Sequence, residues 1–305
     1  FGMLPPFHSL GLAGTIILPL SIGMRTAYHA NPTESTTIAK LIETYSSTTI
    51  IGTPTFINGI LDNTKPEQVV SLKTVFTGAE KCPETVYQKL KQILPKASLC
   101  EGYGITECSP LVSLNSPTEN IPGTIGRIVP SVNYAIINPE NNQPVGQGEK
   151  GLLLVKGPSI FKGYLNQSAS KGFMQYENES WYNTGDFVIE NPRGFLTFSG
   201  RQKRFIKLGG EMISLPAIEN VLQKKLTAND GPAIAVEAEQ TTTQPEIVLF
   251  TTVQVERENV NEMIKQAGFS ALHNIRRVIK VDEIPVLGTG KTDYRQLKEL
   301  LSLKN

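Results

Sequence analysis

The 305-residue sequence has few of the side chains that build redox and metal centres: three cysteines, three histidines and one tryptophan. The cysteines form neither a CxxC pair nor an even disulfide framework, so we expect reduced thiols in a cytoplasmic protein. They are Cys82, Cys100 and Cys108. The histidines are too scattered to predict a metal site. Disulfide-stapled scaffolds and His/Cys metal centres are therefore not expected.

Excess charge and long hydrophobic runs are also absent. With 29 basic and 28 acidic residues the net charge is +1, which indicates no nucleic-acid partner. The longest uncharged run, His8 to Met24, contains Pro19, whereas a spanning helix needs about 20 apolar residues, so we expect a buried core segment. The sequence begins without a basic leader and reads as the middle of a domain, so no signal peptide is expected.

Hydrophobic periodicity predicts an α/β fold for the first two thirds of the chain. Short apolar strands, such as Thr49–Ile51 and Leu72–Phe76, alternate with amphipathic helices. This alternation is typical of a mostly parallel sheet with flanking helices. Ligands bind beyond the carboxyl ends of such strands, where Gly78–Glu80 and Tyr103–Glu107 are expected to lie.

The pattern changes twice along the chain. From Gly123 to Ser199, short strands between turn-rich pieces predict a small antiparallel, β-barrel-like subdomain. A smaller α+β unit follows, in which Ser214 is expected to cap a helix. We therefore expect a large domain over residues 1–199, a junction over 200–204 and a small C-terminal domain over 205–305.

Four short segments contain the residues expected to carry chemistry. In the first, two glycines without Cβ atoms allow the backbone to approach a ligand closely. The Thr106 hydroxyl can hold a phosphate oxygen, and the Glu107 carboxylate can hold the Mg²⁺ that accompanies nucleotides. Taken alone, Thr106 and Glu107 could equally open a capped helical turn. The segments are EGYGITECSP (Glu101–Pro110), WYNTGD (Trp181–Asp186), GRQKRFIKLGGE (Gly200–Glu211) and GTGKTDYRQL (Gly288–Leu297).

In this order, the four segments resemble those of the adenylate-forming superfamily, which includes acyl-CoA synthetases, luciferases and peptide-synthetase adenylation domains. The resemblance covers nearly the whole chain. EGYGITECSP and KRFIKLGGEMISL are most similar to the acyl-carrier-protein synthetase half of bacterial 2-acylglycerophosphoethanolamine acyltransferases. The resemblance implies an ATP- and Mg²⁺-dependent ligase that converts a long-chain fatty acid into an acyl-adenylate. A thiol then displaces AMP.

The resemblance also implies partners. The expected acceptor is the phosphopantetheine thiol of acyl carrier protein, with coenzyme A as the alternative. Arg276, Arg277 and Lys280 are candidates for docking the acidic carrier, although such charges equally protect an edge strand. Peripheral association with the inner face of the cytoplasmic membrane would come only through the acyltransferase half of such bifunctional proteins.

In the large domain, the resemblance assigns Thr106 to the α-phosphate and Glu107 to Mg²⁺. Asp186 would accept hydrogen bonds from the ribose hydroxyls, since one carboxylate can accept from two neighbouring donors. The implied nucleotide-binding residues also include Gly78, Ala79, Glu80, Tyr103 and Gly104. The implied acyl pocket includes His8, Thr53 and Phe56.

In the small domain, the resemblance makes Lys291 the catalytic lysine, a point charge between the substrate carboxylate and the phosphate. Gly288 and Gly290 would give its loop freedom. Arg201 would contact the ribose, and Lys203 would be the hinge of a mobile domain. In a second orientation of that domain, Gly209 and Gly210 would border the tunnel of the thiol. The plain alternatives are a surface ion pair for Arg201 and a solvated loop for Lys291.

One superfamily element does not occur in this sequence. The Ser/Thr/Gly-rich phosphate loop is absent, and no GxxxxGK[ST] or GxGxxG replaces it. We therefore expect the C-terminal part of an adenylating enzyme, which by itself adenylates poorly. A non-catalytic AMP-binding or scaffold module is the alternative from another class.

Overall fold

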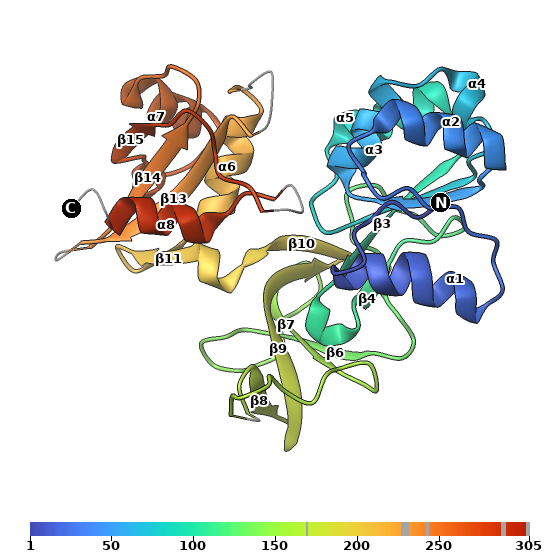
Figure 1. Cartoon of the computed structure of the whole chain (residues 1–305). Helices are drawn as coiled ribbons and strands as arrows, with labels where there is room; N and C mark the ends of the chain where they lie inside the picture. Colours follow the sequence, from blue (N-terminus) through green and yellow to red (C-terminus); the bar gives the residue numbers. More distant parts are fainter. Residues whose placement is uncertain (169, 227–231, 242–243, 288–290, 303–305) are drawn as a thin grey trace. The chain divides into compact units, whose positions relative to one another are not determined.

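The computed structural model describes the chain apart from residues 169, 227–231, 242–243, 288–290 and 303–305 (Figure 1). The chain divides into two compact units, Phe1–Ser199 and Gly200–Asn305. Each unit has its own sheets and its own hydrophobic core, and each is described by itself.

The first sheet of unit 1 has five strands in sequence order. The first three pair in parallel, and the last two join antiparallel. The strands are β1 (Thr49–Gly52), β2 (Thr74–Thr77), β3 (Ser98–Gly104), β4 (Leu111–Leu114) and β5 (Arg127–Ile128). Parallel strands joined through helices confirm the predicted α/β class.

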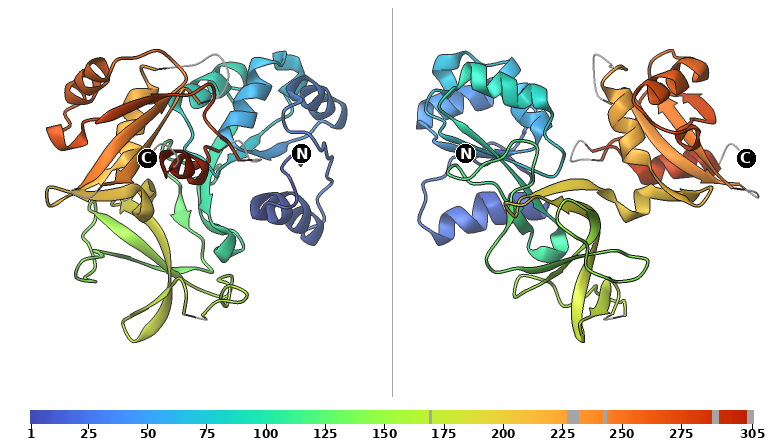
Figure 2. Two further views of the ribbon diagram at one scale, coloured as in Figure 1. Left: turned by 60° about the vertical axis from the view of Figure 1, so that its left-hand side comes forward. Right: turned by 180° about the vertical axis from the view of Figure 1, so that it is seen from behind.

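Four helices cover one face of the parallel strands (Figures 1 and 2). They are α2 (Ser35–Tyr45), α3 (Pro54–Asp62), α4 (Pro66–Val69) and α5 (Glu84–Ile93). Ile50, Val75 and Leu99, one from each parallel strand, lie in the core beneath these helices. Because side chains alternate along a strand, the neighbouring residues point to the opposite face.

A helical segment made of η1 (Gly11–Ile17) and α1 (Leu18–Ser21) lies on that opposite face, where Gly14 approaches the side chain of Ile51. The prediction of a buried core segment is wrong for its large side chains. Leu12, Ile17, Leu18, Leu20, Ile22 and Met24 are exposed. A helix that is apolar all round can turn only one stripe to the sheet, and here small residues form that stripe. Among the described residues, no helix has the length and apolar character to cross a membrane.

The second sheet of unit 1 is antiparallel, with the strand order β10-β9-β7-β6 and with β8 paired to β9. The strands are β6 (Asn133–Ile137), β7 (Lys150–Lys156), β8 (Phe173–Tyr176), β9 (Glu179–Glu190) and β10 (Leu196–Arg201). A shared core that includes Val112 of β4 and Val155 of β7 joins it to the first sheet. The predicted change to antiparallel structure after Gly123 is confirmed.

Unit 2 is a small α+β unit, as predicted. Ser214 accepts the N–H of Ala217 at 3.3 Å and caps α6. Strand β14 pairs antiparallel with β13 and parallel with β15. Alternate residues of the sheet face α6 and α7 on one side and α8 on the other. The elements are β11 (Phe205–Leu208), β12 (Glu211–Ser214), α6 (Leu215–Gln223), β13 (Ile234–Gln240), β14 (Pro245–Thr251), α7 (Arg257–Gln266), β15 (Arg277–Lys280) and α8 (Tyr294–Ser302).

Candidate functional site

The carboxyl ends of the three parallel strands form one edge of the first sheet. Thr53 follows β1, Gly78 follows β2, and Gly104 is the last residue of β3. Because parallel strands end at the same edge, these residues lie at that edge, where Gly78 and Gly104 were expected from the sequence. This edge is where a ligand of an α/β sheet would bind.

The residues after β1 and β2 meet at this edge. The buried Thr53 accepts the N–H of Phe56 at 3.4 Å and so caps α3. Phe56 is half-buried against the core of unit 1. The Thr55 hydroxyl donates to Glu80 at 2.9 Å, which holds Glu80 over the first turn of α3. The predicted pocket and adenine residues are therefore neighbours.

The Gly78–Glu80 loop is held tightly against β3. A Cβ on Gly78 would lie 2.8 Å from the carbonyl oxygen of Gly102. Ala79 has φ +72°, a region that residues other than glycine seldom adopt. The loop continues to Cys82, whose N–H donates to Glu101 Oε2 at 2.6 Å.

Glu101 holds this loop in place through Cys82, a role that was not predicted from the sequence. Its side chain is 2% exposed, and burial raises the pKa of its carboxyl from the ordinary 4.5 to about 7. The sequence signal was a carboxylate directly after an apolar run, which predicts a buried charge that needs a partner.

The turn after β3 is a short 3₁₀ helix, η2 (Thr106–Cys108). Gly104 permits this turn, since a Cβ there would lie 2.1 Å from the carbonyl oxygen of Pro110. Its missing Cβ therefore serves the chain's own return into β4. The exposed Thr106 hydroxyl lies 3.2 Å from that of Ser9, the residue after His8. The His8 ring accepts the N–H of Leu10 at 3.2 Å.

Asp186 lies inside β9 and is 1% exposed. The Tyr103 hydroxyl donates to its Oδ2 at 2.5 Å, so two residues predicted to bind the nucleotide are brought together from different sheets. Glu107 and Asp186 also both act on Cys108. Burial, followed by the charges of these two carboxylates, raises the pKa of this thiol to about 12. Cys108 is therefore a protonated thiol that packs in the core.

Glu107 is half-buried, and its Oε1 accepts the hydroxyl of Tyr164 at 2.6 Å. Within the described part of the chain, no group of three or more His, Cys, Asp or Glu side chains could hold a metal ion by itself. A single carboxylate nonetheless fits Mg²⁺, which proteins commonly hold through one or two carboxylates plus substrate phosphates and water.

The remaining predicted residues belong to unit 2. Arg201 ends β10, and Lys203 lies in η3 (Gln202–Arg204). Gly209 and Gly210 form the two-residue turn between β11 and β12, with φ +59° and +86°. These angles match a type I′ hairpin turn, which glycine adopts without strain.

Lys291 lies beside an antiparallel bridge between Val286 and Thr292. Its carbonyl oxygen accepts the N–H of Leu287 at 2.7 Å, and its side chain is half-buried. Gly288 and Gly290, which were expected to give the loop freedom, lie outside the described residues.

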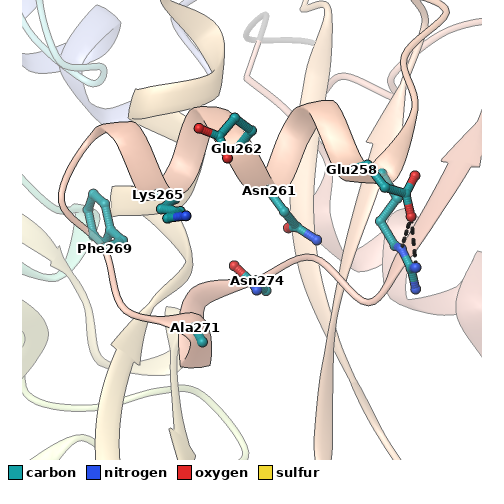
Figure 3. Close-up of a pocket in the computed structure, with 8 residues that line it drawn as sticks. Glu258, Asn261, Glu262, Lys265, Phe269, Ala271 and Asn274 are labelled. Atoms are coloured by element: carbon teal, nitrogen blue, oxygen red, sulfur yellow. Dashed lines mark hydrogen bonds and ion pairs between the residues drawn. The ribbon is translucent and has the colours of Figure 1, made fainter.

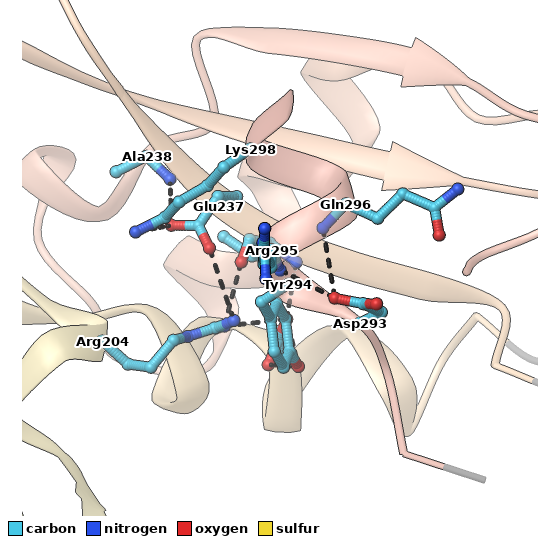
Figure 4. A network of polar contacts seen from close by, with 10 residues as sticks. Arg204, Glu237, Ala238, Asp293, Tyr294, Arg295, Gln296 and Lys298 are labelled. Carbon is cyan, nitrogen blue, oxygen red and sulfur yellow. Dashed lines mark hydrogen bonds and ion pairs between the residues drawn. The ribbon is translucent and has the colours of Figure 1, made fainter. Parts of the chain in front are cut away.

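A buried polar network holds the chain that follows Lys291 (Figure 4). Arg204 places its guanidinium carbon 3.5 Å from the ring centre of Tyr294, the first residue of α8. Glu219 of α6 pairs with Arg204 at 3.0 Å and accepts the Tyr294 hydroxyl at 2.9 Å. The network therefore links the residue after Lys203 to the start of α8, three residues after Lys291.

Unit 2 also has a surface cavity of about 530 Å³ along α7 (Figure 3). Its charged lining is balanced, with Arg257 and Lys265 beside Glu258 and Glu262. None of the residues predicted from the sequence to act in the site lines this cavity.

Comparison with known proteins identifies the family. The model of the family described as AMP-binding enzyme matches residues 1–165, which is more than half of the chain, so the chain belongs to this family. An acyl-CoA ligase of Glarea lozoyensis, gloD, is 26% identical over 324 residues, covering 98% of this chain and 55% of the relative. A long-chain-fatty-acid–CoA ligase of Escherichia coli is 26% identical over 302 residues, covering 97% and 53%. The chain thus spans about half the length of these curated relatives.

Solved structures show the same fold. ATP-bound MatB from Rhodopseudomonas palustris matches with a TM-score of 0.80 and 20% identity, over 98% of this chain and 59% of that one. The O-succinylbenzoate coenzyme A synthetase of Bacillus subtilis, with ATP and a magnesium ion, matches with 0.80 and 23%, over 97% and 60%.

We predict that Glu101→Gln changes the pH dependence of stability. The pKa of Glu101 is about 7 in the folded protein, against an ordinary value of 4.5 in the unfolded chain. Between these pH values the folded protein binds more protons than the unfolded chain, so the free energy of unfolding falls as the pH rises. Glutamine still accepts from Cys82 without this loss. Between pH 5 and pH 8 the variant should therefore gain about 2.5 kcal/mol relative to the wild type, measured by urea unfolding. Glu140→Gln, at an exposed position, is the control, and an unchanged difference at both pH values would contradict the buried-acid account.

Proposed function

We propose that this chain is the site-bearing part of an ATP-dependent acid–thiol ligase that activates a carboxylic acid as an acyl-adenylate. One observation carries the proposal. In a chain of the AMP-binding enzyme family, buried Asp186 accepts a hydrogen bond from Tyr103 of β3, and the Thr106–Glu107 turn follows β3. The proposed ribose carboxylate is then held by a residue of β3, and the proposed phosphate hydroxyl lies in the turn that follows that strand.

In this proposal, Asp186 accepts the ribose hydroxyls, and the Gly78–Glu80 backbone lies along the adenine. Thr106 donates to the α-phosphate while the acid attacks that phosphate and pyrophosphate leaves. Glu107 would hold Mg²⁺, which supplies positive charge against the phosphate oxygens. The reaction concentrates negative charge, so oriented donors and cations contribute more than a general base would.

Unit 2 supplies the second set of proposed roles. Lys291 contributes a point charge to the acid and the phosphate during adenylation, and Arg201 contacts the ribose. Lys203 is the proposed hinge, at which a change of backbone angles would bring the Gly209–Gly210 turn to the site for thiol transfer. The Gly209–Gly210 turn closes the paired hairpin of β11 and β12, and Arg204 holds the start of α8 at Tyr294. Both features support movement of this unit as one body.

The proposed acid is a long-chain fatty acid, in a pocket that includes His8, Thr53 and Phe56. Coenzyme A is the proposed acceptor, because the curated relatives compared above are named CoA ligases. Acyl carrier protein is the second candidate, supported by the sequence resemblance and by an exposed Arg276. Arg277 pairs with Glu239, and Lys280 donates to the carbonyl oxygen of Thr252, directly after β14. Both residues belong to the edge strand β15, and charged side chains are common on edge strands.

Titration of the chain with AMP tests the nucleotide site. Asp186→Asn should weaken AMP binding about 10- to 100-fold, because charge-assisted hydrogen bonds to the ribose are lost while side-chain volume is kept. Isothermal titration calorimetry measures the Kd. Glu190→Gln on the same strand, where the carboxylate accepts the Tyr134 hydroxyl, is the matched control. Equal AMP affinity in Asp186→Asn and wild type would contradict the assignment, whereas AMP binding without pyrophosphate exchange would favour a non-catalytic module.

The role of Lys291 separates the two half-reactions. In the longest natural polypeptide that contains this chain, Lys291→Ala should slow adenylation at least about 100-fold, since a charge acting on the transition state is removed. Thiol transfer from preformed acyl-adenylate should stay within about twofold of wild type. Pyrophosphate exchange and thioester formation measure the two steps, with Lys265→Ala as the control. A parallel loss in both steps would refute the proposed division of labour.

The acceptor is tested by supplying preformed palmitoyl-adenylate with either coenzyme A or holo acyl carrier protein. We expect thioester formation with coenzyme A at least about tenfold faster, measured by chromatography of the products. Faster acylation of the carrier, reduced by Arg276→Glu, would overturn coenzyme A as the acceptor and favour the carrier.

A further inference from the structure

Tyr164 stands out among the contacts of the candidate site. It lies 57 residues from Glu107, in the segment that follows β7, yet its hydroxyl donates to Glu107 Oε1 at 2.6 Å. The same segment holds the Glu107 backbone, because the N–H of Phe161 donates to the Glu107 carbonyl oxygen at 2.8 Å. Both the main chain and the side chain of Glu107 are thus held by one segment.

The Tyr164 ring is itself fixed by other rings. It meets Phe161 edge-on, with 4.8 Å between the ring centres. Phe161 in turn stacks on Phe173 and meets Tyr182 edge-on, at 5.7 and 5.3 Å. Since Phe173 and Tyr182 belong to the paired strands β8 and β9, a rigid sheet sets the direction of the Tyr164 hydroxyl.

The donor directions follow from the chemistry of the groups. The Tyr182 oxygen lies 3.2 Å from the Tyr164 oxygen. An ionised carboxylate only accepts, so the single hydroxyl proton of Tyr164 points to Glu107. In the contact between the two tyrosines the Tyr182 hydroxyl is therefore the donor, which gives a chain of donors from Tyr182 through Tyr164 to Glu107. Hydrogen bonds in such a chain strengthen one another.

We propose that Tyr164 is a positioning residue for Glu107 as the ligand of the cation that accompanies ATP. This inference rests on the proposed function. A carboxylate has about four lone-pair sites, and the Tyr164 hydroxyl takes one of them on Oε1. Oε2 would remain available to the cation, and the long side chain of Glu107 would lose less rotamer freedom on binding. Partners that orient a metal-ligating carboxylate typically change metal affinity about 10- to 100-fold.

The test compares two tyrosines with matched environments. Tyr134 is 38% exposed and donates to Glu190 at 2.6 Å, and Tyr164 is 37% exposed and donates to Glu107 at the same distance. Tyr164→Phe and Tyr134→Phe therefore remove equivalent hydroxyls. Calorimetric titrations of the 305-residue chain use Mg²⁺ with ATP, ATP with a chelator, and AMP alone, and thermal unfolding is recorded for each variant.

In Tyr164→Phe, the gain in ATP affinity that Mg²⁺ provides should fall about tenfold, while AMP affinity and melting temperature stay near those of Tyr134→Phe. Tyr182→Phe should give a smaller loss. An unchanged Mg²⁺ gain in Tyr164→Phe, alongside its loss in Glu107→Gln, overturns this inference and leaves the proposed function intact. Equal weakening of AMP and MgATP binding also overturns it, because the role would then be structural. If Glu107→Gln keeps the gain in ATP affinity that Mg²⁺ provides, or if the wild type binds no nucleotide, the proposed function itself is contradicted, separately from the role of Tyr164.

Discussion

The hydrogen bond from Tyr103 to Asp186 is the contact around which unit 1 builds its candidate site. A carboxylate that is 1% exposed must be hydrogen-bonded, since an unpartnered buried charge is very costly. The donor comes from β3 and the acceptor from β9, so this requirement ties the parallel sheet to the antiparallel one. Displacement of either strand would leave the carboxylate without this donor.

Other carboxylates extend the same constraint outward from that bond. Glu101, two residues before Tyr103, holds the loop after β2 through the N–H of Cys82. Glu107, four residues after Tyr103, accepts from Tyr164. One strand and its turn thereby fix a neighbouring loop, the second sheet and the segment after β7. The site is organised by the need to satisfy acidic groups, while large apolar side chains form the cores behind it.

The positions at the strand ends could be predicted from sequence, because they depend on local signals. Apolar runs mark the parallel strands, and the residues after them must share an edge. The partner of Glu107 could not be predicted, since Tyr164 reaches it only through long-range pairing of the second sheet. The predicted burial of the segment Gly11–Ser21 was wrong for another reason. Large apolar side chains occur on several sides of this helical segment, and its buried residues include Gly11 and Thr15, so the apolar pattern does not mark which stripe meets the sheet.

In unit 2 the buried carboxylate Glu219 has a comparable effect on the chain around Lys291. It joins Arg204 and Tyr294, and both contacts lie on the C-terminal side of Lys203. Breaking one partner of such a buried pair is strongly destabilising, so α6 and the start of α8 stay together with Arg204. A rotation at the proposed hinge, Lys203, would consequently carry Lys291 with the whole unit. The proposed change between two half-reactions then needs new backbone angles at one residue and no rearrangement of the segment that bears the lysine.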